Sequence, residues 1–81
     1  MGIPQIFADF NNADRHGRLR LIFPRSAEDI ERQKLNLSNG LKVIAYDDDE
    51  LSADAEVVFS EEEQIWVAAI DWSQIRRQSK P

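Results

Sequence analysis

Between residues 41 and 70, three apolar runs, in which alternate residues fall on opposite faces, are separated by two polar, acidic connections. The runs cover residues 41–47, 55–59 and 65–70. Alternation with a period of two residues is typical of β-strands that bury one face. Consecutive strands joined by hairpin connections are antiparallel neighbours. This stretch therefore predicts a three-stranded antiparallel meander at the centre of a sheet.

Two further strands are predicted before the meander, over residues 3–10 and 18–23. The connection between them, residues 11–17, is rich in Asn, Asp and Gly, which adopt the backbone conformations of tight loops. We therefore expect these two strands to form a hairpin. Pro4 lacks a backbone N–H group, which places the first strand at an edge of the sheet.

A short helix is predicted after the second strand. Pro24 ends that strand, and Ser26 then matches an N-cap followed by acidic residues, so we expect a helix from Ser26 to about residue 34. It has few apolar positions, and we expect it to cover one end of the sheet. A second helical turn is expected where Asp71 can cap residues 72–77.

Five short strands, one helix and a terminal helical turn predict a mainly β fold in a single small domain over residues 1–81. Closing such a small sheet into a barrel hides its edges and buries one face of every strand. The first expectation is a small five-stranded antiparallel barrel of the SH3-like type. The alternative is an open antiparallel α+β sheet with the helix packed on one face.

The chain contains no cysteine, which excludes disulfides, thiolate zinc sites and a cysteine nucleophile. No apolar run approaches the roughly 20 residues that a membrane-spanning helix needs, so we expect a cytoplasmic protein that does not enter a membrane. The net charge is −5, and residues 45–81 hold ten Asp or Glu against three Lys or Arg. An acidic chain repels nucleic acid, so a nucleic-acid partner is disfavoured.

No group in the sequence predicts catalysis or metal binding. His16, the only histidine, lies in a loop without a serine that it could activate, and we expect it to be exposed to solvent. The acidic run Asp47, Asp48, Asp49 and Glu50 lacks the glycine of a calcium-binding EF-hand loop, which favours a solvated loop. We therefore expect a protein that is not an enzyme and holds no metal ion or cofactor.

Four arginines, Arg15, Arg18, Arg20 and Arg25, form the one basic patch of the sequence. Arg18 and Arg20 share a strand face because alternate residues of a strand point to the same side. Small barrels bind single-stranded nucleic acid by combining arginines with exposed aromatic rings, and Phe7 supplies such a ring if the first two strands pair. The same arginines can instead face acidic loops of their own molecule.

Trp66 and Trp72 are the large aromatic side chains of the second half. Trp66 shares a strand face with Ala68 and Ile70, whose small and aliphatic side chains leave room for an indole, so we expect it to pack in the core. We expect Trp72 to cover one end of the barrel. Tryptophan is also enriched in binding hot spots, so both residues are candidates for a binding site.

The leading hypothesis is a non-enzymatic domain that binds another protein, with the arginine face of the second strand and the acidic loops as docking surfaces of opposite charge. An edge strand offers a route to a homo-oligomer. The alternative is a small barrel that binds single-stranded nucleic acid through its arginines. The candidate binding residues are Phe7, Arg18, Arg20, Arg25, Trp66 and Trp72.

Overall fold

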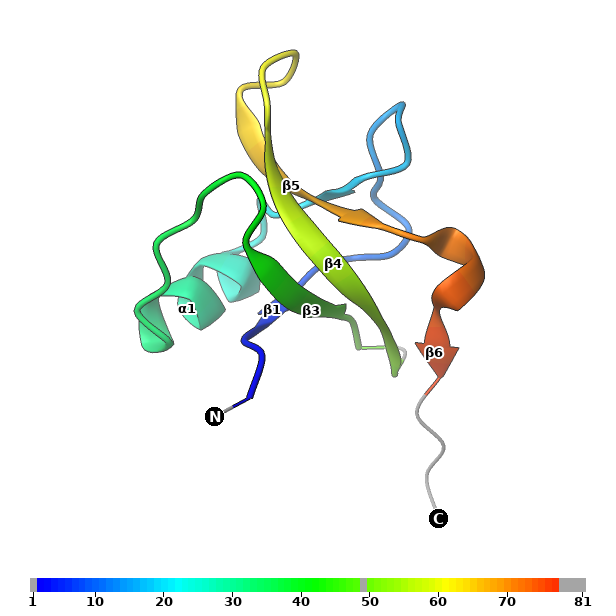
Figure 1. Ribbon diagram of the computed structural model, residues 1–81, viewed down its shortest axis with the longest axis horizontal. Helices are drawn as coiled ribbons and strands as arrows, with labels where there is room; N and C mark the ends of the chain where they lie inside the picture. The colour runs from blue at the N-terminus through cyan, green and yellow to red at the C-terminus, as the bar shows by residue number, and fades with distance from the viewer. Residues whose placement is uncertain (1, 49, 78–81) are drawn as a thin grey trace.

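The chain folds into one curled, mixed β-sheet that forms a half-barrel, with a single α-helix beside it (Figure 1). The computed structural model describes residues 2–48 and 50–77. Its elements are β1 (Gln5–Phe7), β2 (Leu19–Arg20), α1 (Pro24–Arg32), β3 (Lys42–Tyr46), β4 (Leu51–Ser60), β5 (Ile65–Ile70), the 3₁₀ turn η1 (Trp72–Gln74) and β6 (Arg76–Arg77). The predicted mainly β fold with one helix and a C-terminal helical turn is confirmed.

The central meander is formed by β3, β4 and β5, which pair antiparallel in that order. Val43 lies opposite Ala55, and Val57 lies opposite Ala68. β4 begins at Leu51, four residues earlier than predicted, and the acidic connection before it is correspondingly short. The reason is that the alternation continues upstream, because Ala53 is also buried in the core.

The first strand pairs differently from the prediction. β1 is parallel to β3, with Ile6 opposite Ala45, and the strand order β1-β3-β4-β5-β2 places β1 and β2 at opposite ends. Residues 11–17 turn back onto β2 itself, since the Asp14 N–H bonds the Arg18 carbonyl and the Arg20 N–H bonds the Asn12 carbonyl. The expectations of a first hairpin and of a purely antiparallel sheet are therefore wrong.

The C-terminal part of the chain continues along β4. After β5 the chain forms η1, in which the Asp71 side chain accepts a hydrogen bond from the Ser73 N–H at 3.0 Å. The predicted cap is thus confirmed, but the helical turn ends at Gln74. β6 then pairs with the start of β4, so Arg76 lies opposite Ser52.

Helix α1 begins at Pro24, and the preceding Phe23 is its N-cap. Proline is favoured in the first turn because the N–H groups there have no partner within the helix. The prediction that Ser26 caps the helix is wrong, since Ser26 lies inside α1 and its hydroxyl donates to the Phe7 carbonyl at 2.6 Å. The helix lies alongside β1, the strand at one end of the sheet, and covers that end as expected (Figure 1).

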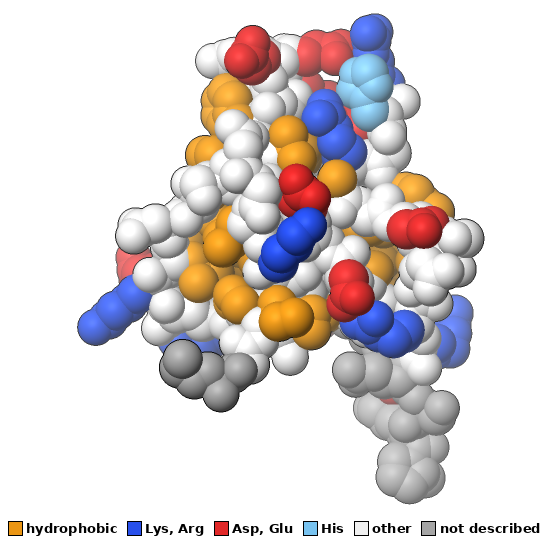
Figure 2. Space-filling model, in the orientation of Figure 1, with side chains coloured by type: hydrophobic (Ala, Val, Ile, Leu, Met, Phe, Trp, Pro, Cys, Tyr) orange, Lys and Arg blue, Asp and Glu red, His pale blue; other side chains and the backbone are white. Residues whose placement is uncertain are grey.

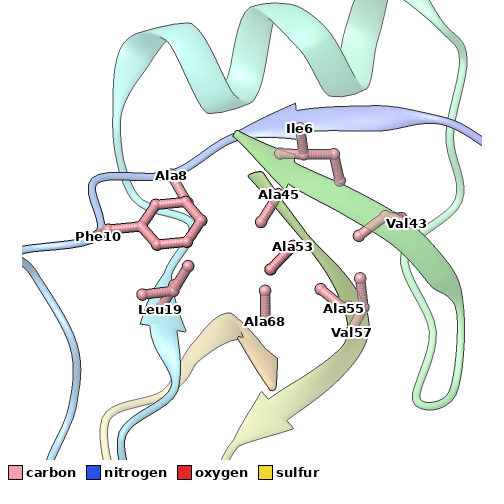
Figure 3. Packing of buried hydrophobic residues seen from close by; sticks show 10 residues of the cluster. All are labelled: Ile6, Ala8, Phe10, Leu19, Val43, Ala45, Ala53, Ala55, Val57 and Ala68. Carbon is pink, nitrogen blue, oxygen red and sulfur yellow. The ribbon is translucent and has the colours of Figure 1, made fainter. Parts of the chain in front are cut away.

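The core lies inside the curl of the sheet and is rich in alanine (Figure 3). Five of its ten buried residues are alanines, which alternate with larger aliphatic and aromatic side chains and leave a narrow interior. The ten residues are Ile6, Ala8, Phe10, Leu19, Val43, Ala45, Ala53, Ala55, Val57 and Ala68. Within residues 2–48 and 50–77, no helix has the length and apolar character needed to cross a membrane.

Candidate functional site

The arginines that the sequence groups into one patch lie in two separate places. Arg18 and Arg20 belong to the β2 end of the sheet, whereas Arg25 lies over the ring of Phe7, with its guanidinium carbon 5.0 Å from the ring centre. Phe7 belongs to β1 and does not extend the surface of Arg18 and Arg20, because β1 and β2 do not pair.

Arg20 is bonded within its own molecule. Its Nε and Nη2 donate to both carboxylate oxygens of Glu63, at 2.7 and 2.8 Å, and its Nη1 donates to Asn12 Oδ1 and to the Ala13 carbonyl. The bond to Glu63 raises the pKa of Arg20 and lowers the pKa of Glu63. The guanidinium therefore ties residues 12–13 to the connection between β4 and β5.

Arg18 is bonded to the buried carboxylate of Asp14. Asp14 accepts from Arg18 Nε at 3.0 Å and from the backbone N–H groups of Arg18 and His16, both at 2.9 Å. Burial opposes ionisation, but these bonds outweigh it and lower the pKa of Asp14. The partners of Arg18 and Arg20 are thus the loop acids Asp14 and Glu63, and Arg18 itself precedes β2. In the sequence, the only sign of this pairing is that both acids lie in loops.

Most cations at the surface are paired in the same way. Of the nine Lys and Arg side chains that the structure describes, seven lie in ion pairs. Figure 2 shows such charges interspersed among apolar side chains, with His16 at the top beside acidic and basic neighbours. The seven are Arg15, Arg18, Arg20, Arg25, Arg32, Lys42 and Arg76.

The two tryptophans occupy different environments. Trp66 is half-buried against the core, and its ring meets that of Phe59 edge to face at 5.2 Å. Trp72 is 46% exposed, yet its ring meets that of Phe10 and its Nε1–H donates to the Gly17 carbonyl at 2.7 Å. Trp72 therefore fastens η1 to the loop before β2.

A cluster of one arginine, two aromatic rings and one carboxylate lies at the other end of the sheet. Arg25 contacts the rings of Phe7 and Tyr46, which meet edge to face with their centres 5.9 Å apart. Arg25 also forms an ion pair with Asp48, and this bond raises the pKa of Arg25. Phe7, Tyr46 and Asp48 together thus form a surface that is complementary to a guanidinium group.

An acidic hollow of about 190 Å³ adjoins this cluster. Because β1 and β3 are parallel, both strands end at the same side of the sheet, and the residues that follow them meet there. Among the residues that the structure describes, no group of three or more His, Cys, Asp or Glu is arranged to hold a metal ion. The lining residues, which define the acidic hollow, are Phe7, Asp9, Asn11, Asp47 and Asp48.

The cluster is anchored by Asp29, whose side chain is only 3% exposed. Its carboxylate accepts from Tyr46 Oη at 2.6 Å, from Arg32 Nη2 at 2.7 Å and from the Phe7 N–H at 2.9 Å. Burial raises the pKa of Asp29, but these three bonds outweigh burial and the pKa is lowered. Burial and the bond to Asp29 raise the pKa of Tyr46.

A larger hollow of about 480 Å³ lies between the N-terminal segment and the end of α1. Among the described residues that line it, Arg32 has the one charged side chain, which is bonded to Asp29. The hollow therefore brings together no group of reactive side chains.

No family model matches this chain, and no curated protein or solved structure matches it significantly. The candidate site therefore stands on its own geometry.

Proposed function

We propose that the chain is a non-enzymatic protein-binding domain and that the acidic hollow accepts a lysine or arginine side chain of the partner. The observation that carries this proposal is that three acidic residues, Asp9, Asp47 and Asp48, line one hollow beside the aromatic ring of Phe7. A carboxylate-lined hollow with an aromatic wall attracts a cation both by charge and through the π-system of the ring.

Arg25 supports the choice of a cationic side chain. Its guanidinium, which belongs to the chain itself, lies against Phe7 and pairs with Asp48, and both of these residues line the hollow. A partner cation would bind at Asp9, whose carboxylate also accepts the Asn11 N–H at 2.8 Å, whereas Asp47 is buried and accepts the Leu51 N–H. The overall net charge of −5 favours the approach of a basic partner.

Arg18 and Arg20 contribute indirectly in this proposal. Both side chains are about three-quarters buried and bonded to carboxylates of their own molecule, so a docking partner would have to displace those bonds. We propose that they position residues 11–17, which begin with Asn11 of the hollow. The same internal pairing leaves few free cations for phosphates, which weighs against single-stranded nucleic acid as the ligand.

The test is a titration of the ¹⁵N-labelled protein with short blocked peptides that contain arginine or lysine, followed by NMR. We expect saturable shifts at the amides of Asp9, Asn11 and Asp48. The variant Asp9→Asn/Asp48→Asn should bind several-fold more weakly. A matched control, Glu28→Gln/Glu31→Gln, removes the same charge from exposed residues of α1 and should bind as the wild type does.

If both variants bind the peptides more weakly to the same degree, the loss of net charge explains the weaker binding and the hollow is not the binding site. Shifts with a single-stranded oligonucleotide but not with the peptides would favour the nucleic-acid alternative.

A further inference from the structure

The outward side of β1 is bonded by side chains and not by another strand. Ile6 pairs toward β3, so the N–H and C=O groups of Gln5 and Phe7 face away from the sheet. Gln33, the C-cap of α1, accepts from the Gln5 N–H at 3.2 Å and donates to the Gln5 carbonyl at 2.7 Å. Asp29 accepts from the Phe7 N–H. Ser26 donates to the Phe7 carbonyl, which completes the set of four bonds.

These three residues, Ser26, Asp29 and Gln33, are called the helix cover below. They take the place that the backbone of a neighbouring strand would occupy. An open strand edge invites pairing with another chain, so the cover closes the edge at which pairing would otherwise occur.

The cover is held on by little apolar burial. The two buried residues of α1 are Ser26 and Asp29, both polar, and Ile30 is only partly buried against the core. At nine residues, α1 is also shorter than the roughly 12–15 residues at which isolated helices become marginally stable. Its attachment therefore rests on polar contacts, which are the hydrogen bonds to β1, the bond from Tyr46 Oη to Asp29 and the contacts of Arg25 with the rings of Phe7 and Tyr46.

The edge beneath the cover is suited to pairing with itself. Residues 4–8 carry no charged side chain of the kind that keeps natural edge strands apart. In an antiparallel pair of β1 strands related by a twofold axis at Ile6, Gln5 of each copy lies opposite Phe7 of the other. The outward N–H and C=O groups of both residues would then be bonded in both copies.

We propose that α1 is a removable cover of the β1 edge, and that β1 of a second copy of this chain takes its place when the cover is displaced. The monomer is the closed state, and the twofold β1 pair joins two half-barrels into one continuous sheet. This inference does not rest on the acidic hollow, although displacement of α1 would also withdraw Arg25 from Phe7 and Asp48.

The test is sedimentation of the variant Ser26→Ala/Gln33→Ala over a wide range of protein concentration. We expect the wild type to remain monomeric and the variant to shift to the dimer mass as concentration rises. The control Glu28→Ala/Glu31→Ala changes two exposed residues of α1 and should stay monomeric. If the double variant does not fold, Gln33→Ala alone, which changes a half-exposed side chain, carries the same test with weaker dimerisation.

A synthetic peptide with the sequence of residues 3–9 identifies the surface. It should inhibit dimerisation of the variant, whereas the same peptide N-methylated at its Gln5 and Phe7 positions should not, because it lacks the N–H donors. A folded variant that stays monomeric at every concentration overturns the proposal. A dimer that neither peptide disrupts would also overturn the proposal. A variant that binds the peptide but does not associate with itself would overturn it as well.

Discussion

At β1 the outward backbone groups are bonded by three side chains of the helix cover. At the β2 end the Arg18 carbonyl and the Arg20 N–H are bonded by the backbone of residues 12–14, and only the Arg18 N–H is bonded by a side chain, that of Asp14. The β2 end is further fastened by charge, through Arg18 with Asp14 and Arg20 with Glu63. Both ends of one small sheet are thus closed, by different chemistry.

The difference determines how each end can be opened. A side-chain cover is lost when the side chains change, even where the backbone stays in place. A backbone cover persists after substitution, because its N–H and C=O groups are present in every residue except proline. We therefore expect substitutions at β1 to have large, local effects and substitutions at β2 to have smaller ones.

Asp29→Ala should have the largest effect on stability. It removes the buried acceptor of the Phe7 N–H and of Tyr46 Oη, and hydrogen bonds to charged groups contribute about 1.5–3 kcal/mol each. We expect the free energy of unfolding, measured by urea denaturation, to fall by about 3 kcal/mol. Asp29→Asn, which keeps an acceptor oxygen, should lose less. Equal losses in the two variants would show that the bonds to Phe7 and Tyr46 do not matter.

Gly17→Ala should have the next largest effect, at the β2 end. Gly17 has a φ of 78°, a conformation that costs other residues about 1–2 kcal/mol, and an added Cβ would lie 3.1 Å from Trp72 Nε1. We expect unfolding at lower urea and a changed tryptophan emission as Trp72 moves. Gly2→Ala is the control, because nothing lies within 4 Å of its Cβ position. An unchanged emission would contradict the role of Trp72 in fastening the loop.

Arg20→Met should destabilise the protein less than Asp29→Ala, because the backbone bonds along β2 remain. Its four hydrogen bonds to Glu63, Asn12 and Ala13 are lost, and residues 12–13 should become more mobile in amide relaxation. Arg15→Met removes an exposed pair with Glu62 and should have almost no effect. If both variants unfold at the same urea concentration, the hydrogen bonds of Arg20 contribute nothing to the stability of the protein.

Acid should weaken the protein through two of its buried aspartates, Asp29 and Asp14, and this effect on stability should be smallest near neutral pH. The folded-state pKa values of Asp29 and Asp14 lie below the ordinary 3.8, so the unfolded chain binds more protons in acid. Their contribution to stability is complete above 3.8 and is lost as pH falls from 3.8 through the lowered folded-state pKa values. Urea denaturation as a function of pH should show this loss, and Asp29→Asn should reduce it. If the stability of wild type and variant depends on pH in the same way, Asp29 is excluded as a source of the acid sensitivity.

The sequence predicts the meander because apolar runs are separated by polar connections, and residues 42–46 encode a buried face locally, with Val43 and Ala45 buried between less buried neighbours. It does not predict the partner of β1, since a parallel pair between residues 5–7 and 44–46 leaves no local pattern. Ser26 and Asp29 illustrate the same limit. Both fit the start of a helix, and only the position of β1 gives them their bonds to Phe7.

The acidic hollow was beyond sequence reasoning for the same reason. Asp9 and Asn11 read as loop residues, and the run after β3 reads as a solvated acidic loop, of which Asp49 lies outside the described residues. The two segments meet only because β1 and β3 run in the same direction. The pairing of strand arginines with acidic loops of the same molecule was one of the alternatives that the sequence offered.

The most direct test of the central claim, that side chains of α1 close the β1 edge, is backbone amide hydrogen exchange at Gln5 and Phe7. In the wild type, the Phe7 amide should be protected to a degree similar to the Ile44 amide, which bonds the Pro4 carbonyl within the sheet. Gln33→Ala should release the Gln5 amide and leave the Phe7 amide protected. Exchange of both amides in the wild type at the rate of an unstructured peptide would contradict the account.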